Sequence, residues 1–168
     1  LVFGNAFSWL SDNSSILYYV AAADRGDKPV RNMVPEGPVV QESTGKQGQA
    51  RTYQDLLKDP ADELIFEYYG TSQLKLWDGN KSVNLGKQQM ITNISPSPDG
   101  QYFLISIINR PFSFMVPFYY FPTSTQIWDI RGNPVKTLFS APLTENIPRG
   151  YDVVLPGPRS FIWRADKP

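Results

Sequence analysis

Histidine and cysteine are both absent from this 168-residue chain, and each absence removes a class of chemistry. Without histidine these residues form no Ser-His-Asp or Cys-His arrangement, no imidazole general base and no histidine-bound zinc site. Without cysteine they form no disulfide framework, no thiolate nucleophile and no thiolate metal site. Catalysis would need carboxylates, lysine or tyrosine, and we predict no catalytic residue, no metal site and no cofactor in this segment.

Net charge and long apolar runs are lacking as well. Sixteen basic residues balance sixteen acidic ones, so no global field draws the chain to nucleic acid, and no nucleic-acid partner is expected. No apolar run approaches the roughly 20 residues of a membrane span. The chain starts at Leu1 without a methionine, so we expect that any targeting segment would already have been removed. A hydrophobic content of 41% is enough for the core of one domain.

A turn followed by a strand is the recurring unit of the sequence. Ser97-Pro98-Asp99-Gly100 has the residues of a tight turn, and residues 101–107 supply a β-branched and aromatic run that predicts a buried strand. Aligned on the aspartate, similar patterns surround Asp12 and Asp166. We therefore predict that Asp12, Asp99 and Asp166 occupy equivalent corners.

Two hairpins share a second pattern. Trp77-Asp78 and Trp128-Asp129 each end a predicted strand and lead into a turn that contains glycine and asparagine. Turn-strand units and hairpins alternate along the chain, which gives four antiparallel strands per repeat. That is the composition of one blade of a β-propeller.

The predicted fold is therefore mainly β, a partial β-propeller of four-stranded antiparallel blades with a short helical insertion. Residues 1–168 would be a fragment of one propeller domain. The first blade covers about 7–86 with a loop-helix insertion at 23–70, the second covers about 94–139, and residues 161–168 start a third. A closed propeller has roughly four to eight blades. Open blade edges predict self-association or pairing with the missing blades.

The insertion is expected to hold two short helices. Thr52 and Asp55 have the spacing of a capping box, and Asp59-Pro60 forms a second start signal before Gly70 ends the helix. Five carboxylates could suggest a paired-carboxylate or metal site: Asp55, Asp59, Asp62, Glu63 and Glu67. The favoured interpretation is that the first four are helix caps and dipole partners and that Glu67 lies on a solvated face.

An aromatic run at 109–122 has two interpretations. Six aromatics and three prolines could form a stacking platform for a sugar, a proline-rich peptide or a nucleobase. The favoured alternative is a strand and its flanking loop packed into the core, with proline at the ends. Residues 141–159 are predicted to connect two blades, with Arg149 and Arg159 among their polar contacts.

Three blocks of the sequence closely resemble a known family. They are residues 51–74 (RTYQDLLKDPADELIFEYYGTSQL), 109–129 (NRPFSFMVPFYYFPTSTQIWD) and 160–168 (SFIWRADKP). Their pattern is similar to the N-terminal propeller of the prolyl oligopeptidase family, nearest to its glutamyl endopeptidase branch. The resemblance implies a serine peptidase in which a propeller caps an α/β-hydrolase domain and admits peptides to it.

The chain departs from such an enzyme in lacking a nucleophile elbow. The nearest match to G-x-S-x-G is Gly70-Thr71-Ser72-Gln73-Leu74, which lacks the second glycine. No catalytic residue is carried over, and the segment should be inactive alone. Arg110, Arg149 and Arg159 are candidate contacts for an acidic substrate side chain or for another domain, while ordinary blade-edge salt bridges are the favoured alternative.

Function and partners follow from the resemblance. The favoured function is the non-catalytic propeller portion of a serine peptidase, with peptide substrates, the missing blades and the hydrolase domain as partners. A WD-repeat-like interaction scaffold is one alternative, and a secreted carbohydrate-binding module that uses the aromatics at 112–121 is another. The compartment stays open, with an extracytoplasmic location favoured for a bacterial parent.

Overall fold

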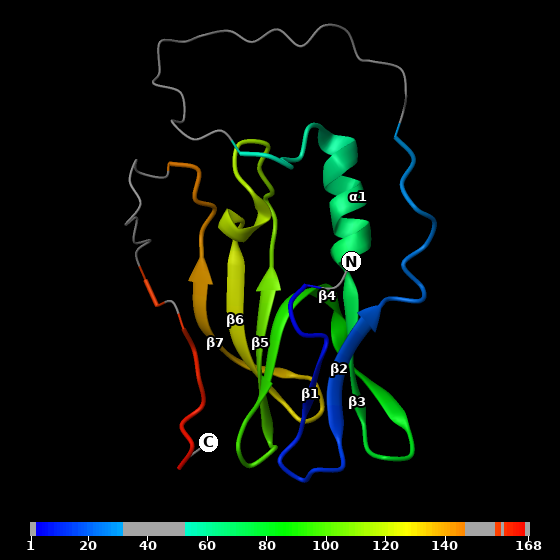
Figure 1. Cartoon of the computed structure of the whole chain (residues 1–168), viewed down its shortest axis with the longest axis vertical. Helices are drawn as coiled ribbons and strands as arrows, with labels where there is room; N and C mark the ends of the chain where they lie inside the picture. Colours follow the sequence, from blue (N-terminus) through cyan, green and yellow to red (C-terminus); the bar gives the residue numbers. More distant parts are fainter. Residues whose placement is uncertain (1–2, 32–52, 147–156, 159, 167–168) are drawn as a thin grey trace, which may run out of the picture.

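A computed structural model describes residues 3–31, 53–146, 157–158 and 160–166, in which seven strands form one antiparallel sheet. The strands follow each other in sequence order, and the sheet curls into a half-barrel (Figure 1). The strands are β1 (Phe7–Trp9), β2 (Ile16–Ala21), β3 (Ser72–Trp77), β4 (Ser82–Pro96), β5 (Tyr102–Ile108), β6 (Thr123–Asp129) and β7 (Pro134–Ala141). The prediction of a mainly β fold with a short helix is confirmed.

The fifteen-residue strand β4 belongs to both halves of the sheet. Its residues 82–89 pair with β3, and its residues 90–96 pair with β5. We call β1, β2, β3 and the first part of β4 the first meander, and the second part of β4 with β5, β6 and β7 the second meander. The sequence predicted a strand at 82–85 and did not predict its continuation. Beyond its pairing with β3, the backbone N–H and C=O groups of β4 find new partners on β5. The strand therefore continues past Gly86.

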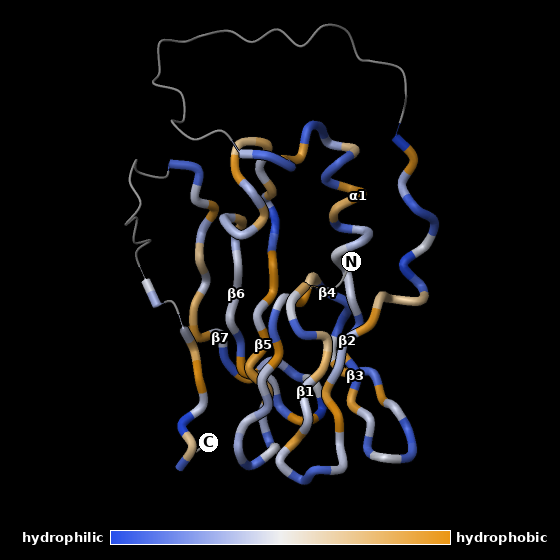
Figure 2. The backbone as a smooth tube through the Cα atoms, in the orientation of Figure 1, coloured by the Kyte–Doolittle hydropathy of each residue, from blue (hydrophilic) through white to orange (hydrophobic). Residues whose placement is uncertain are grey.

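The main hydrophobic core lies between the two meanders. Its buried side chains come from both: Leu10, Leu17, Tyr19, Leu74, Leu85, Ile91, Ile94, Phe103, Ile105, Ile107 and Trp128. Strands alternate inward and outward side chains, so each meander supplies one face to this core. Figure 2 shows hydrophobic stretches within β5 and hydrophilic residues at the tip of the β3–β4 hairpin. The sheet therefore curls because burying these two faces removes apolar area from water.

The predicted aspartate corners of the two meanders share one hydrogen bond, in which the carboxylate accepts from the backbone N–H two residues further along the chain. Between β1 and β2, the Asp12 carboxylate accepts hydrogen bonds from the backbone N–H groups of Ser14 (2.9 Å) and Ser15 (2.8 Å). Between β4 and β5, the Asp99 carboxylate accepts one from the Gln101 N–H (3.0 Å). Hydrogen bonding from Ser15 and then Ser14 lowers the pKa of Asp12 to about 2, and hydrogen bonds also lower the pKa of Asp99.

The backbone of the two corners matches as well. The Asn13 N–H donates to the Leu10 carbonyl at 3.1 Å, and the Gly100 N–H donates to the Ser97 carbonyl at 2.9 Å. Asn13 and Gly100 take left-handed φ values of 54° and 69°, a conformation open to both residue types. Asp12 and Asp99 thus occupy equivalent corners, as predicted. Asp166 pairs with Arg164 at 2.7 Å, and its equivalence to the other two stays a prediction.

The two Trp-Asp hairpins repeat each other in the same way. The Asp78 carboxylate accepts from the N–H groups of Asn80 and Lys81, both at 2.9 Å. The Asp129 carboxylate accepts from the N–H of Asn133 at 2.8 Å and from the N–H of Arg131 at 2.9 Å. These hydrogen bonds lower the pKa of both carboxyl groups. The four short connections, β1–β2, β3–β4, β4–β5 and β6–β7, are therefore each closed by an aspartate that accepts backbone hydrogen bonds.

One helix, α1 (Pro60–Gly70), lies between β2 and β3. Asp59 caps it by accepting from the Asp62 N–H at 2.9 Å, and Pro60 occupies the first turn, as predicted. The prediction of an additional helix before it is wrong, because residues 53–59 form no helix and Asp55 has a positive φ of 59°. No helix in the described part of the chain is long and apolar enough to cross a membrane.

A second hydrophobic cluster lies beside α1. Its buried members are Phe3, Met90, Ile108, Phe112, Val116 and Phe121. Phe66 of α1 packs against it, with its ring 5.3 Å from Phe112 and 5.7 Å from Phe121, edge to face. The aromatic run is thus packed in part into the core, as favoured. The predicted strand is wrong, because a loop and one 3₁₀ turn, η1 (Phe118–Tyr120), occupy its place.

Gly86 of β4 lies directly against Trp128 and the β6–β7 turn of the second meander. A Cβ at Gly86 would lie 2.4 Å from the Trp128 ring, and one at Gly132 would lie 2.5 Å from the Gly86 nitrogen. Both glycines also have positive φ, of 61° and 83°. The two meanders can approach each other here only because neither residue carries a side chain.

We predict that Gly86→Ala destabilises the chain more than Gly79→Ala does. Both alanines would adopt a left-handed φ, at about 1–2 kcal/mol each, but a Cβ at Gly79 would meet open space. Gly86→Ala should therefore cost about 1–3 kcal/mol beyond the control, because its methyl group collides with Trp128. Urea unfolding of the two variants measures the difference, and equal midpoints would contradict this account of the bend.

A second prediction concerns acid stability. The folded pKa of Asp12, about 2, lies below the ordinary value of roughly 3.9. Its contribution to stability is therefore complete above about pH 4 and is lost as the pH falls toward 2. Asp12→Asn should unfold at lower urea concentration than the unmodified chain at pH 7 and at nearly the same concentration at pH 2. Asp27→Asn, in an exposed loop, is the control, and a pH-independent difference for Asp12→Asn would refute the prediction.

Candidate functional site

Arg110 joins the helix to the sheet. It lies just after β5, and its guanidinium pairs with the carboxylates of Glu67 at 2.8 Å and Glu63 at 3.0 Å, both on α1. The same guanidinium lies over the Phe112 ring, 4.6 Å from the ring centre. Hydrogen bonds to Glu67 and then Glu63 raise the pKa of Arg110, so the group stays charged. Arg110 is thus a cation held by two carboxylates.

The local sequence explains this arrangement. Glu63 and Glu67 are four residues apart on α1, so they lie on one face of the helix, and Phe66 faces the second cluster beside them. Once Phe66 is buried against Phe112, the two carboxylates are brought to the end of β5. The aromatic contact therefore sets the position of the ion pairs.

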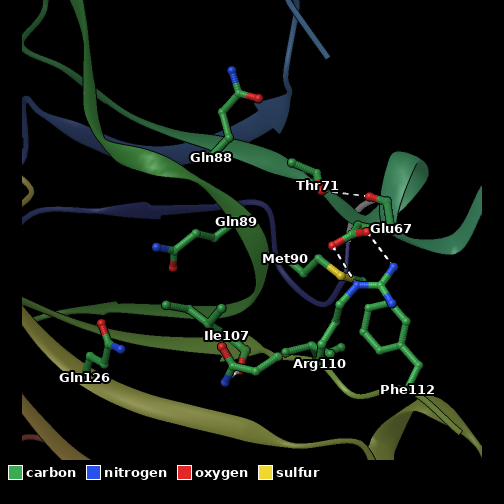
Figure 3. Close-up of a pocket in the computed structure, with 11 residues that line it drawn as sticks. Glu67, Thr71, Gln88, Gln89, Met90, Ile107, Arg110, Phe112 and Gln126 are labelled. Atoms are coloured by element: carbon green, nitrogen blue, oxygen red, sulfur yellow. Dashed lines mark hydrogen bonds and ion pairs between the residues drawn. The ribbon is translucent and has the colours of Figure 1, made fainter. Parts of the chain in front are cut away.

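A pocket of about 330 Å³ adjoins this ion-pair cluster (Figure 3). Figure 3 shows the pair of Glu67 and Arg110 at one end and Gln126 at the other. The lining residues are Glu67, Thr71, Gln88, Gln89, Met90, Ile107, Ile108, Asn109, Arg110, Phe112 and Gln126. They come from α1, β4, β5, β6 and the loop after β5, so the pocket forms where the two meanders and the helix meet.

The pocket is lined by carboxamides, which sequence reasoning did not single out. Gln88, Gln89, Asn109 and Gln126 each bring a group that both donates and accepts hydrogen bonds. Three are partly engaged, because Gln88 donates to the Asp24 carboxylate, Asn109 donates to the Ser124 hydroxyl at 3.1 Å and Gln126 accepts from the Trp128 indole at 2.8 Å. This set matches the hydrogen bonding of a peptide group, and glutamine in a strand gives no pattern that predicts it.

No nucleophile and base are paired in the pocket. The Thr71 hydroxyl donates to the Glu67 carbonyl at 2.7 Å and so caps the end of α1. Ser72, the serine of the imperfect elbow sequence, is buried in β3 and donates to the Gln89 carbonyl at 3.2 Å. Both hydroxyls have structural partners, so the pocket suits binding and not acyl transfer.

The predicted contact residues and carboxylates have different outcomes. Arg110 is placed as described above, and its role as a substrate contact stays a prediction. Arg149 and Arg159 lie outside the described residues. Glu67 lies on a solvated face, as favoured, since its side chain is 42% exposed, and it also pairs with Arg110. Asp59 caps α1, and Asp62, in its first turn, accepts a hydrogen bond from the Lys58 N–H. Both carboxylates also pair with Arg31, which the sequence did not indicate.

No metal-binding cluster is found in the described ranges. There, no group of three or more histidine, cysteine, aspartate or glutamate side chains could hold a metal ion. Four of the five candidate carboxylates instead form two separate sets, Asp59 and Asp62 around Arg31 and Glu63 and Glu67 around Arg110. The cations hold each set as structural ion pairs.

The fold and the pocket define a mainly β protein of two repeated antiparallel meanders, with a polar pocket where they meet α1. Comparison of the sequence with known proteins adds two relatives, both named "Probable glutamyl endopeptidase, chloroplastic". The protein from Oryza sativa subsp. japonica is 41% identical over 166 residues, and the one from Arabidopsis thaliana is 41% identical over 165. The matches cover 98% and 97% of this chain.

The match covers only a small part of each relative. This chain spans 18% of the rice protein and 17% of the Arabidopsis protein. No family profile matches the chain, and no solved structure does. The similarity supports a glutamyl-endopeptidase-like family, and the names of the relatives support a family of peptidases, which are hydrolases.

We predict that Arg110→Gln loosens α1. The ion pairs are partly exposed, so their loss should lower the unfolding free energy by only about 1 kcal/mol. Amide hydrogen exchange within residues 60–70 should become faster, and the difference from the unmodified chain should shrink in 1 M salt. Lys136→Gln, exposed on β7, is the control. Unchanged exchange in the helix would mean that Arg110 does not hold α1 in place.

Proposed function

We propose that this chain is a non-catalytic β-propeller portion of a serine peptidase that resembles the prolyl oligopeptidase family. In this proposal it limits the access of peptides to an α/β-hydrolase domain located elsewhere in a longer protein. The observation that carries the proposal is the 41% identity, over 98% of the chain, to a relative named as a probable glutamyl endopeptidase. The catalytic serine, aspartate and histidine would lie in the hydrolase domain.

The repeat geometry supports the propeller. Two four-stranded meanders carry equivalent aspartate corners and pack their faces together in one core. Propeller blades are four-stranded antiparallel sheets arranged around an axis, and adjacent blades pack face to face. A single flat sheet would not bury Leu17 of the first meander together with Phe103 of the second.

The absence of histidine supports a non-catalytic role for the segment. A gate needs a rigid scaffold and surfaces that meet a peptide, and it needs no nucleophile of its own. The carboxamide-lined pocket is the best candidate in the described residues for meeting a peptide, because neutral amides pair with peptide groups. Arg110 is less suited to an acidic ligand, because Glu63 and Glu67 already compensate its charge.

The proposal predicts a difference between this segment and the longer protein. The purified 168-residue chain should not hydrolyse reporter peptides that contain a glutamyl or prolyl residue at the cleavage site. The longest polypeptide that its gene encodes should cleave the glutamyl reporter and should lose that activity on treatment with a serine-directed fluorophosphonate. The matched control is the longer polypeptide with its reactive serine replaced by alanine.

Two results would contradict the proposal. Turnover by the 168-residue chain that survives repurification would show that the segment carries its own catalytic groups. A well-folded longer polypeptide that cleaves none of the reporter peptides and does not react with the fluorophosphonate would remove the peptidase assignment.

A further inference from the structure

The two meanders can be aligned residue by residue through their strand pairing. Ile16 of β2 pairs with Trp77 of β3, and at the same place in the second meander Phe103 of β5 pairs with Trp128 of β6. The pairing of β1 with β2 corresponds in the same way to that of β4 with β5. The correspondences are Phe7 with Ile94, Trp9 with Pro96, Ile16 with Phe103, Tyr18 with Ile105 and Trp77 with Trp128.

Corresponding residues differ sharply in burial. Phe103, Ile105 and Trp128 are at most 1% exposed, because this face of the second meander packs on the first. On the first meander the same face is only partly covered, because Ile16, Tyr18 and Trp77 are half-buried. Phe7 and Trp9 are 60% and 55% exposed there. Phe7, Ile16, Tyr18 and Trp77 line a shallow apolar hollow of about 390 Å³.

The end of the chain supplies a third example of the same packing. Phe161 and Trp163 hold the positions of Phe7 and Trp9 when the repeats are aligned on their aspartates. Both line a pocket with Leu104 and Ile127 on the second meander. The Trp163 indole N–H donates to the Ser95 carbonyl of β4 at 2.9 Å. Residues at these positions therefore lie against the preceding meander.

The receiving face is also equivalent. Leu104 and Ile127 pair across β5 and β6, as Leu17 and Leu76 pair across β2 and β3. Leu17 is in the main core and Leu76 packs against it, so the first meander receives the second on this face. One face of each repeat, formed by Leu17 and Leu76 or by Leu104 and Ile127, thus packs against the next repeat. The opposite face, which holds Trp77 or Trp128, packs in the second repeat against the previous one. On the first meander this opposite face lacks such a neighbour in the described residues.

We propose that the partly exposed face formed by Phe7, Trp9, Ile16, Tyr18 and Trp77 is the docking surface for one further four-stranded meander, encoded outside residues 1–168 of a longer polypeptide. That meander would present an aliphatic face equivalent to Leu17 and Leu76. More than four fifths of each relative lies outside the match, which leaves room for further repeats. A second copy of this chain fits less well, because residues 160–163 already line its own face of Leu104 and Ile127.

The test uses the absence of cysteine from the chain. Phe7→Cys and Trp9→Cys are made separately, and Val135→Cys, at a 59% exposed position on β7, is the control. Each variant is prepared in the 168-residue chain and in the longest polypeptide that the gene encodes, with any other cysteines replaced by serine. The rate of reaction with a maleimide is measured for all six proteins.

The ratio of the rate at position 7 or 9 to the rate at position 135 is the readout. We expect this ratio to fall at least tenfold in the longer polypeptide at both positions. An unchanged ratio at both positions would overturn the proposal, and so would a reading frame that encodes no residues beyond these 168. The inference rests on the repeat and not on the peptidase assignment. Protection in a longer polypeptide without peptidase activity would support it while removing the proposed function.

Discussion

The structure depends on one strand that serves two half-sheets. β4 pairs with β3 along its first half and with β5 along its second, so the chain passes between meanders without leaving backbone groups unpaired. The change of partner requires a sharp turn of the sheet. Gly86 and Gly132 allow it, because the backbone of β4, the β6–β7 turn and the Trp128 ring occupy the space that side chains would need.

The candidate site follows from that bend. Where β4 changes partner, its residues Gln88 to Met90 face the ends of β5 and β6 and the end of α1. The helix is fixed there by Phe66 in the second cluster and by the ion pairs of Arg110. The pocket is therefore a product of the junction between meanders, and its polar lining comes from elements that are distant in the sequence.

Local patterns predicted the turns and strands well. The carboxylates of Asp12, Asp78, Asp99 and Asp129 accept hydrogen bonds from backbone N–H groups only a few residues away. The sequence around each aspartate is therefore enough to predict its turn. The Asp59-Pro60 start of α1 is a local signal of the same kind. The helix predicted before it does not form, although Thr52 and Asp55 have the spacing of a cap. Tyr53 and Leu57 pack on the second cluster from a non-helical segment, so tertiary packing overrides a weak local propensity.

The sequence could not predict the features that depend on distant contacts. The continuation of β4 beyond Gly86 requires β5 as a partner, and the pairing of Glu67 with Arg110 joins residues 43 positions apart. The carboxamide pocket was missed because glutamine and asparagine have no spacing that indicates a site. The aromatic run was predicted to be packed, but its loop conformation depends on distant contacts. Phe112 and Phe121 are buried in the cluster against which Phe66 of α1 packs.

The central claim is that these meanders are successive blades around a common axis in a larger peptidase. A structure of the longest polypeptide encoded by the gene tests it most directly. The account predicts that the two meanders follow each other around one axis, with a further meander on the face of Phe7 and Trp9 and a hydrolase domain at one end of the axis. Meanders that share no axis, or a longer chain with no second domain, would contradict it.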